Sequence, residues 1–212
     1  MFFADGRISV RNGDCVRPVL SADEIAIPGV HNIENYMAAV AAVDGLVSDE
    51  GIREVAASFS GVEHRIELVR EVHGVKYYND SIASSPTRTI AGLRSFRQKV
   101  ILIAGGKDKN IDYAPLGPEI VQHVRFLILT GGDVIGSTVP KICAAVLNAP
   151  EYDSVALPIL LIDDFEEAVR AAAAQASEGD VVLLSPASTS FDKFSNFMER
   201  GKTFKAVVNH LE

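Results

Sequence analysis

Two different arrangements of apolar and polar positions divide the chain. Up to Leu20, apolar and polar residues alternate around Asp5-Gly6 and Asn12-Gly13, which are favourable hairpin turns, so we expect two or three short antiparallel strands. Helices are expected from about Asn32 to Val43 and from about Asp49 to Phe59. These elements cannot enclose a core on their own.

From Gly61 onward, short apolar strands alternate with helices. The expected strands are RIELVREV, VKYYND, VILIAGG, RFLILTGG, PILLID and DVVLLSPA. The helices are expected to begin near Pro86, Ala114, Asp133 and Asp164, with Pro86 in a first helical turn and Asp163 or Asp164 as an N-cap. Continuously apolar strands indicate a mainly parallel sheet covered on both faces. We therefore expect a doubly wound, Rossmann-like α/β domain over residues 61–212, preceded by an incomplete α+β piece at residues 1–60.

Composition narrows the class of protein. The chain has 212 residues, 48% of them hydrophobic, which is enough for one large domain or for one domain plus part of another. It has no run of about 18 apolar residues and no secretion signal, so we expect a cytoplasmic location. Cys15 and Cys143 form no metal-type or redox-type spacing, in keeping with a reduced compartment. A net charge of −8 opposes general attraction to nucleic acids or membranes, and neither is an expected partner.

The carboxyl ends of the expected strands are polar or rich in glycine, and ligands of doubly wound sheets bind beyond those ends. These ends are Asn79-Asp80-Ser81, Gly105-Gly106-Lys107-Asp108-Lys109, Thr130-Gly131-Gly132-Asp133 and Ser185-Pro186-Ala187-Ser188. In the last of them, hydroxyls gather just before an aromatic-rich helix, at Ser185, Ser188, Thr189 and Ser190. Side-chain donors and the N–H groups of a helix start can together hold a carboxylate or phosphate. An ordinary N-cap cluster is the alternative.

Two lysines follow the glycine pair after VILIA. Lys107 and Lys109 lie where the backbone can come close to a ligand and can act there as mobile charges, although solvated loop lysines are the alternative. The chain contains neither GxGxxG after the first strand nor GxxxxGK[ST]. A dinucleotide fingerprint and a P-loop are therefore both missing, which argues against an autonomous kinase or ATPase.

Four further polar residues are candidates for binding a nucleotide. Asn32 and Asn35 lie three residues apart at a helix start, where their carboxamides suit the edge of a purine or simply cap the helix. Arg65 can grip phosphate or carboxylate, or form a surface ion pair. Asp80 ends a strand and can take a ribose hydroxyl or orient a metal-bound water, but aspartate there is also a common turn former.

Four segments, in this order and spacing, resemble the Mur ligase family, and within it the members that add D-glutamate. They are HNIENYMAA, HRIELVREVHGVKYYNDSIASSPTRTIAGLRSF, ILIAGGKDKNIDY and LLSPASTSFDKFSNFMERGKTF. The resemblance covers essentially the whole chain but only the latter half of such enzymes. It implies that residues 1–60 are the end of the central ATP-binding domain and that residues 61–212 are the C-terminal domain that brings the amino acid.

The resemblance assigns a role to each matching position. The positions implied to bind ATP are Asn32, Asn35, Arg65 and Asp80. The positions implied to bind D-glutamate are Ser84, Lys109, Ser190 and Phe197. Among these, Lys109 and the hydroxyls would receive carboxylates, Phe197 would shape the pocket, and Lys109 is the catalytic candidate. Many members carry lysine two residues after the aspartate of NDS, where this chain has Ile82, so the expected cation is missing there; Lys107 and Arg88 are the candidates to replace it.

The resemblance also implies a reaction. ATP, with Mg²⁺, would phosphorylate the terminal carboxylate of UDP-N-acetylmuramoyl-L-alanine in the synthesis of peptidoglycan precursors, and the D-glutamate amine would attack the acyl phosphate. The P-loop and the magnesium ligands would lie upstream of Met1. We therefore expect no metal ligand in this chain, no cofactor bound by it, and no activity from it alone. The full-length enzyme is expected to be a monomer, whereas exposed strand edges would allow these 212 residues to dimerise.

Two alternatives stay open at this stage. The first is another amide ligase, either a different Mur ligase or a folylpolyglutamate-type enzyme, because the HN and GG elements are shared more widely than SPASTSFDKF. The second is a free-standing module that binds an acidic ligand or a partner protein without chemistry.

Overall fold

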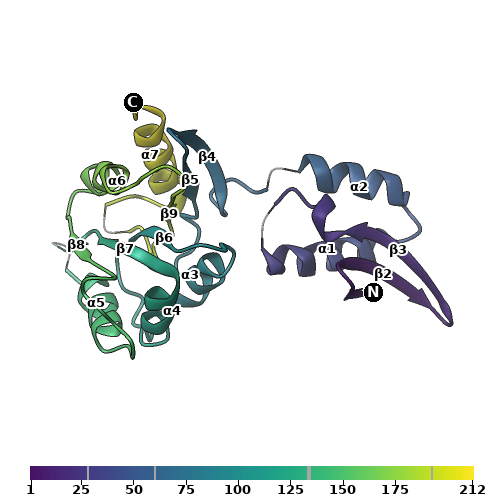
Figure 1. Ribbon diagram of the computed structural model, residues 1–212, viewed down its shortest axis with the longest axis horizontal. Coiled ribbons are helices and arrows are strands. Elements are labelled where there is room, and N and C mark those ends of the chain that lie inside the picture. The colour runs from purple at the N-terminus through teal and green to yellow at the C-terminus, as the bar shows by residue number, and fades with distance from the viewer. Residues whose placement is uncertain (28, 60, 133–134, 192) are drawn as a thin grey trace. The chain divides into compact units, whose positions relative to one another are not determined.

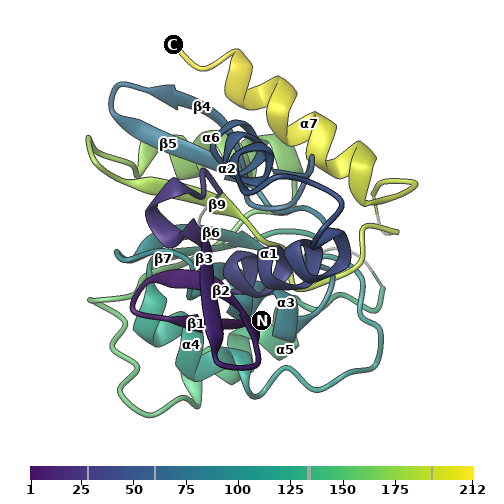
Figure 2. The same cartoon turned by 90° about the vertical axis from the view of Figure 1, so that its right-hand side faces the viewer.

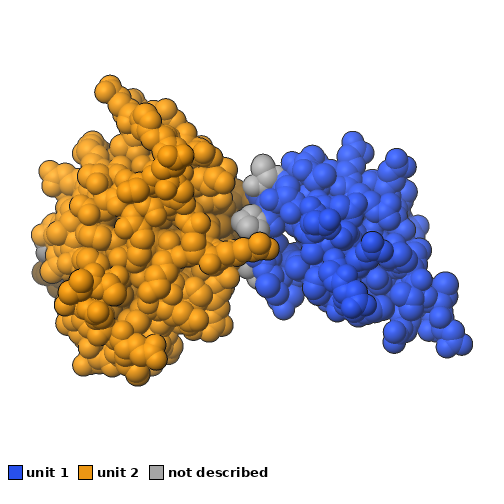
Figure 3. All heavy atoms as spheres, in the orientation of Figure 1, with its two compact units in different colours: residues 1–61 blue, residues 62–212 orange. Residues whose placement is uncertain are grey.

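The computed structural model describes residues 1–27, 29–59, 61–132, 135–191 and 193–212. The chain divides into two compact units, Met1–Gly61 (unit 1) and Val62–Glu212 (unit 2), which Figure 3 shows in separate colours. No helix within these described ranges is long and apolar enough to cross a membrane. The assignment of residues 1–60 to an ATP-binding domain remains a prediction.

Unit 1 is a small α+β structure. Its three strands form an antiparallel sheet in the order β1-β2-β3: β1 (Phe2–Ala4), β2 (Arg7–Asn12) and β3 (Cys15–Ser21). A short 3-10 helix (Ala22–Glu24) is followed by α1 (Val30–Val43) and α2 (Asp49–Ser58). The expectation that these elements cannot enclose a core on their own is wrong, because their buried side chains form one apolar cluster: Ile8, Val10, Val19, Leu20, Val40, Ile52 and Ala56.

The two hairpin turns of unit 1 differ in how well the sequence predicted them. Asp5 and Gly6 both have positive φ, 51° and 72°, which confirms the first expected turn. The second turn is shifted by one residue, because Asn12 pairs with Cys15 and the loop is Gly13-Asp14. Gly13 has a φ of 61°, and a glycine at the first loop position suits this two-residue connection.

Unit 2 contains a six-stranded sheet in the order β4-β5-β9-β6-β7-β8. The strands are β4 (Glu67–Val72), β5 (Val75–Asn79), β6 (Val100–Ala104), β7 (Val124–Leu129), β8 (Ile159–Leu161) and β9 (Val181–Leu184). Only β4 runs antiparallel to its neighbour β5; the remaining pairs are parallel. All the expected strands are present, and the predicted mainly parallel α/β fold is confirmed.

Helices cover both faces of this sheet. They are α3 (Pro86–Leu93), α4 (Leu116–His123), α5 (Val139–Leu147), α6 (Phe165–Ala174) and α7 (Phe197–Asn209). α3, α4 and α5 lie on one side, and α6 and α7 on the other (Figure 1, Figure 2). In β6, Val100, Leu102 and Ala104 belong to the core on the first side, whereas Ile101 and Ile103 belong to the core on the second. Burial on both faces is why this strand is apolar throughout.

The starts of the helices test the predicted capping signals. Pro86 occupies the first turn of α3, and Asp164 caps α6 by accepting a hydrogen bond from the Glu167 N–H at 2.8 Å, as predicted. The start expected near Asp133 is wrong: α5 begins at Val139, and Asp133 itself lies outside the described residues. The backbone at Gly136, just before α5, is hydrogen-bonded to the loop after β6, because Asp108 N–H donates to Gly136 O at 2.9 Å.

Candidate functional site

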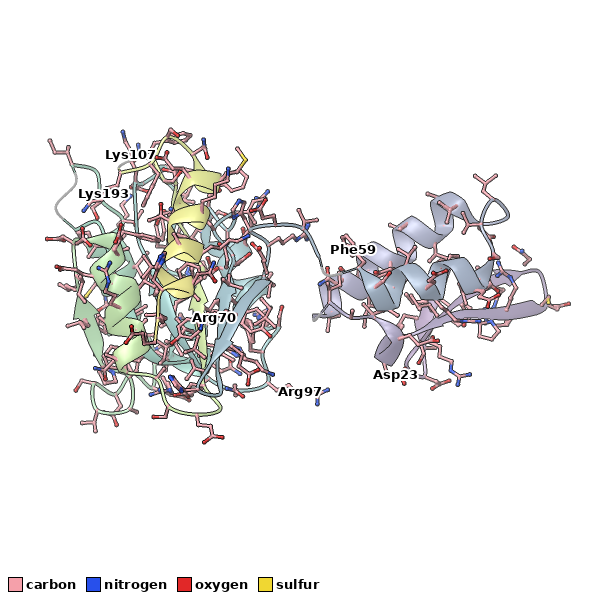
Figure 4. All side chains as sticks on the ribbon, turned by 90° about the horizontal axis from the view of Figure 1, so that it is seen from above. Asp23, Phe59, Arg70, Arg97, Lys107 and Lys193 are labelled. Atoms are coloured by element: carbon pink, nitrogen blue, oxygen red, sulfur yellow. The ribbon has the colours of Figure 1, made fainter. Side chains whose placement is uncertain are left out.

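The loops that follow the parallel strands of unit 2 lie along one edge of its sheet, which we call the carboxyl edge. It is formed by residues after β5, β9, β6, β7 and β8, because parallel strands end on the same side. Arg65 precedes the antiparallel strand β4 and therefore belongs to the same edge. Figure 4 shows Lys107 and Lys193 at one end of unit 2 and Arg97 at the opposite end.

The loops after β6 and β9 are joined by their backbones. Lys107 N–H donates to Thr189 O at 3.1 Å, and Thr189 N–H donates back to Lys107 O at 3.2 Å. A Cβ at Gly106 would lie 2.4 Å from Thr189 O, so the glycine allows this close approach. The space that a Cβ at Gly105 or Gly106 would fill is taken by the protein's own backbone, at Thr130 O and Thr189 O respectively, whereas the approach of a ligand to this loop remains a prediction.

Most of the clustered hydroxyls are used in hydrogen bonds inside the protein. Ser185 Oγ donates to Asp80 Oδ2 at 2.8 Å, and Thr189 Oγ1 donates to Lys107 O at 2.9 Å. Ser188 Oγ lies 2.7 Å from Thr138 Oγ1. These three side chains therefore connect neighbouring loops. Ser190 is also buried, and its carbonyl accepts from Phe194 N–H at 2.9 Å.

The last helix does not begin at these hydroxyls. α7 starts at Phe197, and its N-cap is Asn196, whose Oδ1 accepts from Glu199 N–H at 2.9 Å. The prediction that Ser185, Ser188, Thr189 and Ser190 lie at a helix N-terminus is therefore wrong. Its physical reason is the loop between Ser190 and α7, which separates the hydroxyls from the helix dipole.

A buried arginine that the sequence reasoning missed connects the loops after β5 and β9. Arg200, on α7, is only 3% exposed. Its guanidinium donates to Ser81 Oγ and Ser81 O at 3.1 and 2.9 Å, and to Ser188 O and Thr189 O, both at 3.2 Å. One signal was present in the sequence. Arg200 shares the helical spacing of the buried residues Phe204 and Val207, which places a charge on an apolar face.

Asp80 lies below the loop surface and is 4% exposed. Its Oδ1 accepts from Ile66 N–H at 3.3 Å, and its Oδ2 accepts from Ser185 Oγ at 2.8 Å. Burial raises the pKa of Asp80 to about 7, although these hydrogen bonds and the charges of Arg65 and Arg88 act in the opposite direction. Both carboxylate oxygens thus already have protein donors.

Arg65 stands between two residues of unusual backbone geometry. His64 and Ile66 have φ angles of 68° and 45°, in the left-handed region that β-branched residues rarely adopt. The His64 ring is buried, lies 2.9 Å from Asn79 Nδ2, and meets the Phe197 ring edge-on. Burial lowers the pKa of His64 below its usual value. Arg65 itself is exposed, and no described carboxylate forms an ion pair with it.

The residues expected to hold D-glutamate lie in connected loops of the carboxyl edge. Lys109 Nζ donates to Ser84 Oγ at 3.2 Å, which brings the loops after β6 and β5 together. Phe197 is bound to the same β5 loop, because its carbonyl accepts from Ser81 Oγ at 2.7 Å. Ser190 follows Thr189, whose backbone pairs with Lys107. All four residues therefore belong to one interlinked set of loops.

The two asparagines expected on the ATP side belong to unit 1. Both lie in the first turns of α1, where Asn35 Nδ2 donates to Asn32 Oδ1 at 3.3 Å. Asn32 is buried and Asn35 is exposed. Gly29, not Asn32, is the N-cap of α1, so the helix starts slightly earlier than predicted.

One cluster in unit 2 has the residue types of a metal site. The side-chain ligand atoms of Glu63, His64 and Glu67 lie within 4.8 Å of one another. Lys205 forms ion pairs with both of these carboxylates, and Asn79 Nδ2 donates to Glu67 Oε2 at 3.1 Å. An ammonium group thus supplies the positive charge that a metal ion would bring.

Comparison with known proteins identifies the family. Residues 64–188 match the family model described as "Mur ligase, glutamate ligase domain". The chain belongs to the Mur ligase family. Two relatives, both named UDP-N-acetylmuramoylalanine--D-glutamate ligase, come from Acetivibrio thermocellus and Ruminiclostridium cellulolyticum. They are 54% and 50% identical over 98% and 99% of this chain. The resemblance to D-glutamate-adding Mur ligases stated from the sequence is thereby confirmed.

This Mur ligase chain spans about 44% of the length of those relatives. Its fold is shared with solved structures of low sequence identity. FolC from E. coli, solved with ADP, has a TM-score of 0.65 at 18% identity and covers 98% of this chain and 46% of its own. UDP-N-acetylmuramate-alanine ligase MurC from Thermotoga maritima has a TM-score of 0.62 at 16% identity, covering 87% and 39% respectively. These likenesses support the fold alone.

Proposed function

We propose that this Mur ligase chain provides the amino-acid-binding part of an ATP-dependent ligase that joins D-glutamate to UDP-N-acetylmuramoyl-L-alanine. The observation that carries the proposal is the contact between Lys109 and Ser84. The ammonium is exposed and is held by a hydroxyl at 3.2 Å, and no carboxylate in the described ranges forms an ion pair with it. A cation placed in this way is available to an acidic ligand.

The chemistry of the ligand fits the loops. Lys109 offers ammonium donors, Ser84 and Ser190 offer hydroxyls, and Phe197 offers an apolar wall at the start of α7. The chain's task is then to bind and orient the amino acid so that its amine meets the activated carboxylate of the other substrate. Holding two reactants in this way converts a bimolecular step into an effectively unimolecular one and removes several kcal/mol from the barrier.

The residues expected to contact ATP fit it unequally. Asn35 is exposed and Arg65 is exposed without an ion pair among the described carboxylates, so both can bind a nucleotide. Asp80 fits less well, since protein donors already occupy both of its oxygens. When bound with Mg²⁺, ATP would supply the phosphoryl group that activates the carboxylate. The cytoplasmic location and the monomeric state of the full-length enzyme remain part of this proposal.

The test is a titration of the 212-residue chain followed by amide NMR, with D-glutamate, L-glutamate and D-alanine as ligands. D-glutamate should shift the amides of Ser84, Lys109 and Ser190 saturably. L-glutamate should bind more weakly, and D-alanine should bind weakest because it lacks the second carboxylate. A preference for L-glutamate, or shifts outside the carboxyl edge only, would overturn the assignment.

A further inference from the structure

Four cations of unit 2 lie at the carboxyl edge without forming an ion pair in the described ranges. They are Arg65, Arg88, Lys107 and Lys109, all exposed, and none forms an ion pair with a carboxylate in the described ranges. Elsewhere in the unit, Lys141 forms an ion pair with Asp108 and Arg125 forms one with Asp180, whereas Arg97, at the opposite end, forms none with a carboxylate in the described ranges. The chain carries eight more negative than positive charges, so acidic partners are not scarce. The grouping of four such cations at the edge where ligands of doubly wound sheets bind favours an anionic ligand there.

Two of these cations approach the same short loop, residues 80–85. Arg88, in the first turn of α3, donates from Nη1 to Ile82 O at 3.2 Å. Lys109 donates to Ser84 Oγ at 3.2 Å. Since Ile82 and Ser84 are two residues apart, the guanidinium and the ammonium both lie beside this loop. The Arg88 guanidinium makes no other hydrogen bond among the described residues, so most of its five donors remain available.

The loop that carries both contacts is well fixed. Ile82 N–H donates to His64 O at 3.2 Å, and Ser84 N–H donates to Ile82 O at 2.8 Å. The buried guanidinium of Arg200 donates a hydrogen bond to Ser81 O. Ile82 itself brings no charge, so the positive charge beside this loop comes from its neighbours.

Lys107 does not share this position. Its backbone pairs with Thr189 and with Ser137, on the part of the loop that faces β9 and α5. No hydrogen bond within the described residues joins Lys107 to loop 80–85. Of the two cations that the sequence offered as replacements for a lysine at position 82, the contacts favour Arg88.

We propose that Arg88 and Lys109 act as a pair, each receiving one carboxylate of the incoming acidic amino acid, which makes Arg88 a specificity-determining residue. This inference rests on the proposed function. The guanidinium matches a carboxylate with two parallel N–H donors, whereas the ammonium acts as a point charge. An amino acid with a single carboxylate would leave one of the two cations unpaired, so the pair selects a dicarboxylate.

The test combines three ligands with three variants of the 212-residue chain. The ligands are D-glutamate, D-glutamine, which lacks the side-chain charge, and the α-amide of D-glutamate, which lacks the other charge. The variants are Arg88→Gln, Lys109→Gln and the control Arg97→Gln, an exposed arginine at the opposite end of unit 2 (Figure 4). Dissociation constants come from amide NMR titration.

We expect Arg88→Gln to weaken D-glutamate binding about tenfold or more, as for the loss of a hydrogen bond to a charged group. Of the two amide ligands, the one that lacks the carboxylate bound by Arg88 should bind Arg88→Gln and the unaltered chain equally well. Lys109→Gln should show the complementary pattern with the other amide, and Arg97→Gln should change nothing.

The outcomes separate the two proposals. Two results would show that the role of Arg88 is wrong while the proposed function stands. In the first, the unaltered chain and Arg88→Gln bind D-glutamate equally well. In the second, Arg88→Gln raises the dissociation constants of all three ligands by the same factor. If the unaltered chain does not bind D-glutamate, the proposed function fails, and the role of Arg88 fails with it.

Discussion

The guanidinium of Arg200 binds both the hydroxyl and the backbone carbonyl of Ser81, although the two residues are 119 positions apart in the chain. The same group also reaches the carbonyls of Ser188 and Thr189. A single buried charge on α7 therefore holds the loops after β5 and β9, which carry Ser84 and Ser190 of the proposed amino-acid-binding residues.

Arg200→Gln should destabilise unit 2 by about 3 kcal/mol, because removing the guanidinium leaves buried carbonyl groups without donors. Arg200→Lys should lose nearly as much, since an ammonium cannot reproduce the planar fork. Denaturant-dependent hydrogen exchange of the β6 and β9 amides measures the free energy of unfolding of unit 2 separately from that of unit 1. Arg97→Gln is the matched control and should stay within about 0.5 kcal/mol. Exchange in Arg200→Gln equal to that of the control would contradict the role of Arg200.

The stability of unit 2 should depend on the ionisation of Asp80. Burial raises its pKa to about 7 in the folded state, above the value of about 4 in an unfolded chain. At a pH between these two pKa values, the Asp80 carboxyl is protonated in the folded state but ionised in the unfolded chain. Its contribution to the free energy of unfolding therefore falls as pH rises from about 4 to 7. The full effect is on the order of 4 kcal/mol.

Asp80→Asn, which cannot ionise, isolates this effect. The free energy of unfolding of the unaltered chain, minus that of Asp80→Asn, should fall as pH rises from 4.5 to 7.5 and level off above the folded-state pKa. Glu167→Gln, at an exposed carboxylate of α6, is the control for removing a negative charge from unit 2. A difference that stays constant with pH would mean that Asp80 ionises as readily in the fold as in the unfolded chain.

Gly201 leaves room for the His64 ring. A Cβ there would lie 2.3 Å from His64 Nδ1 and 3.1 Å from Asn79 Nδ2. Gly201→Ala should therefore destabilise unit 2 by roughly 1–3 kcal/mol, even though alanine favours a helix over glycine. In a His64→Ala background the ring is gone, and the same change should be neutral or stabilising. Hydrogen exchange of α7 amides in this double-mutant cycle measures the coupling, and additive effects would refute the steric explanation.

Lys107 and Lys109 form a matched pair within one loop. Only Lys109 contacts Ser84, whereas Lys107 is held through its backbone by Thr189. Lys109→Met should raise the dissociation constant for D-glutamate about tenfold or more, and Lys107→Met should change it less than about twofold. Both side chains are exposed, so neither change should alter the thermal unfolding midpoint. Equal losses in the two variants would point to the net charge of the loop as the cause.

Local signals in the sequence were sufficient for the architecture of unit 2. The apolar run at Val100–Ala104 predicted a strand buried on both faces, and Pro86 and Asp164 marked helix starts that the structure confirms. These features depend on neighbours within a few residues, because burial pattern and capping are local properties of a strand or helix. The family resemblance likewise depended on short sequence motifs, whose residues are neighbours in the chain.

The tertiary structure alone decided how the polar groups are used. Ser185 donates a hydrogen bond to Asp80, Thr189 donates one to Lys107 O, and Arg200 donates one to Ser81 Oγ. These partners are 82 to 119 positions apart in the chain. A hydroxyl in the sequence has the same appearance whether it faces a ligand or a buried carbonyl. Only the strand order, which places β9 between β5 and β6, determines which donor meets which acceptor.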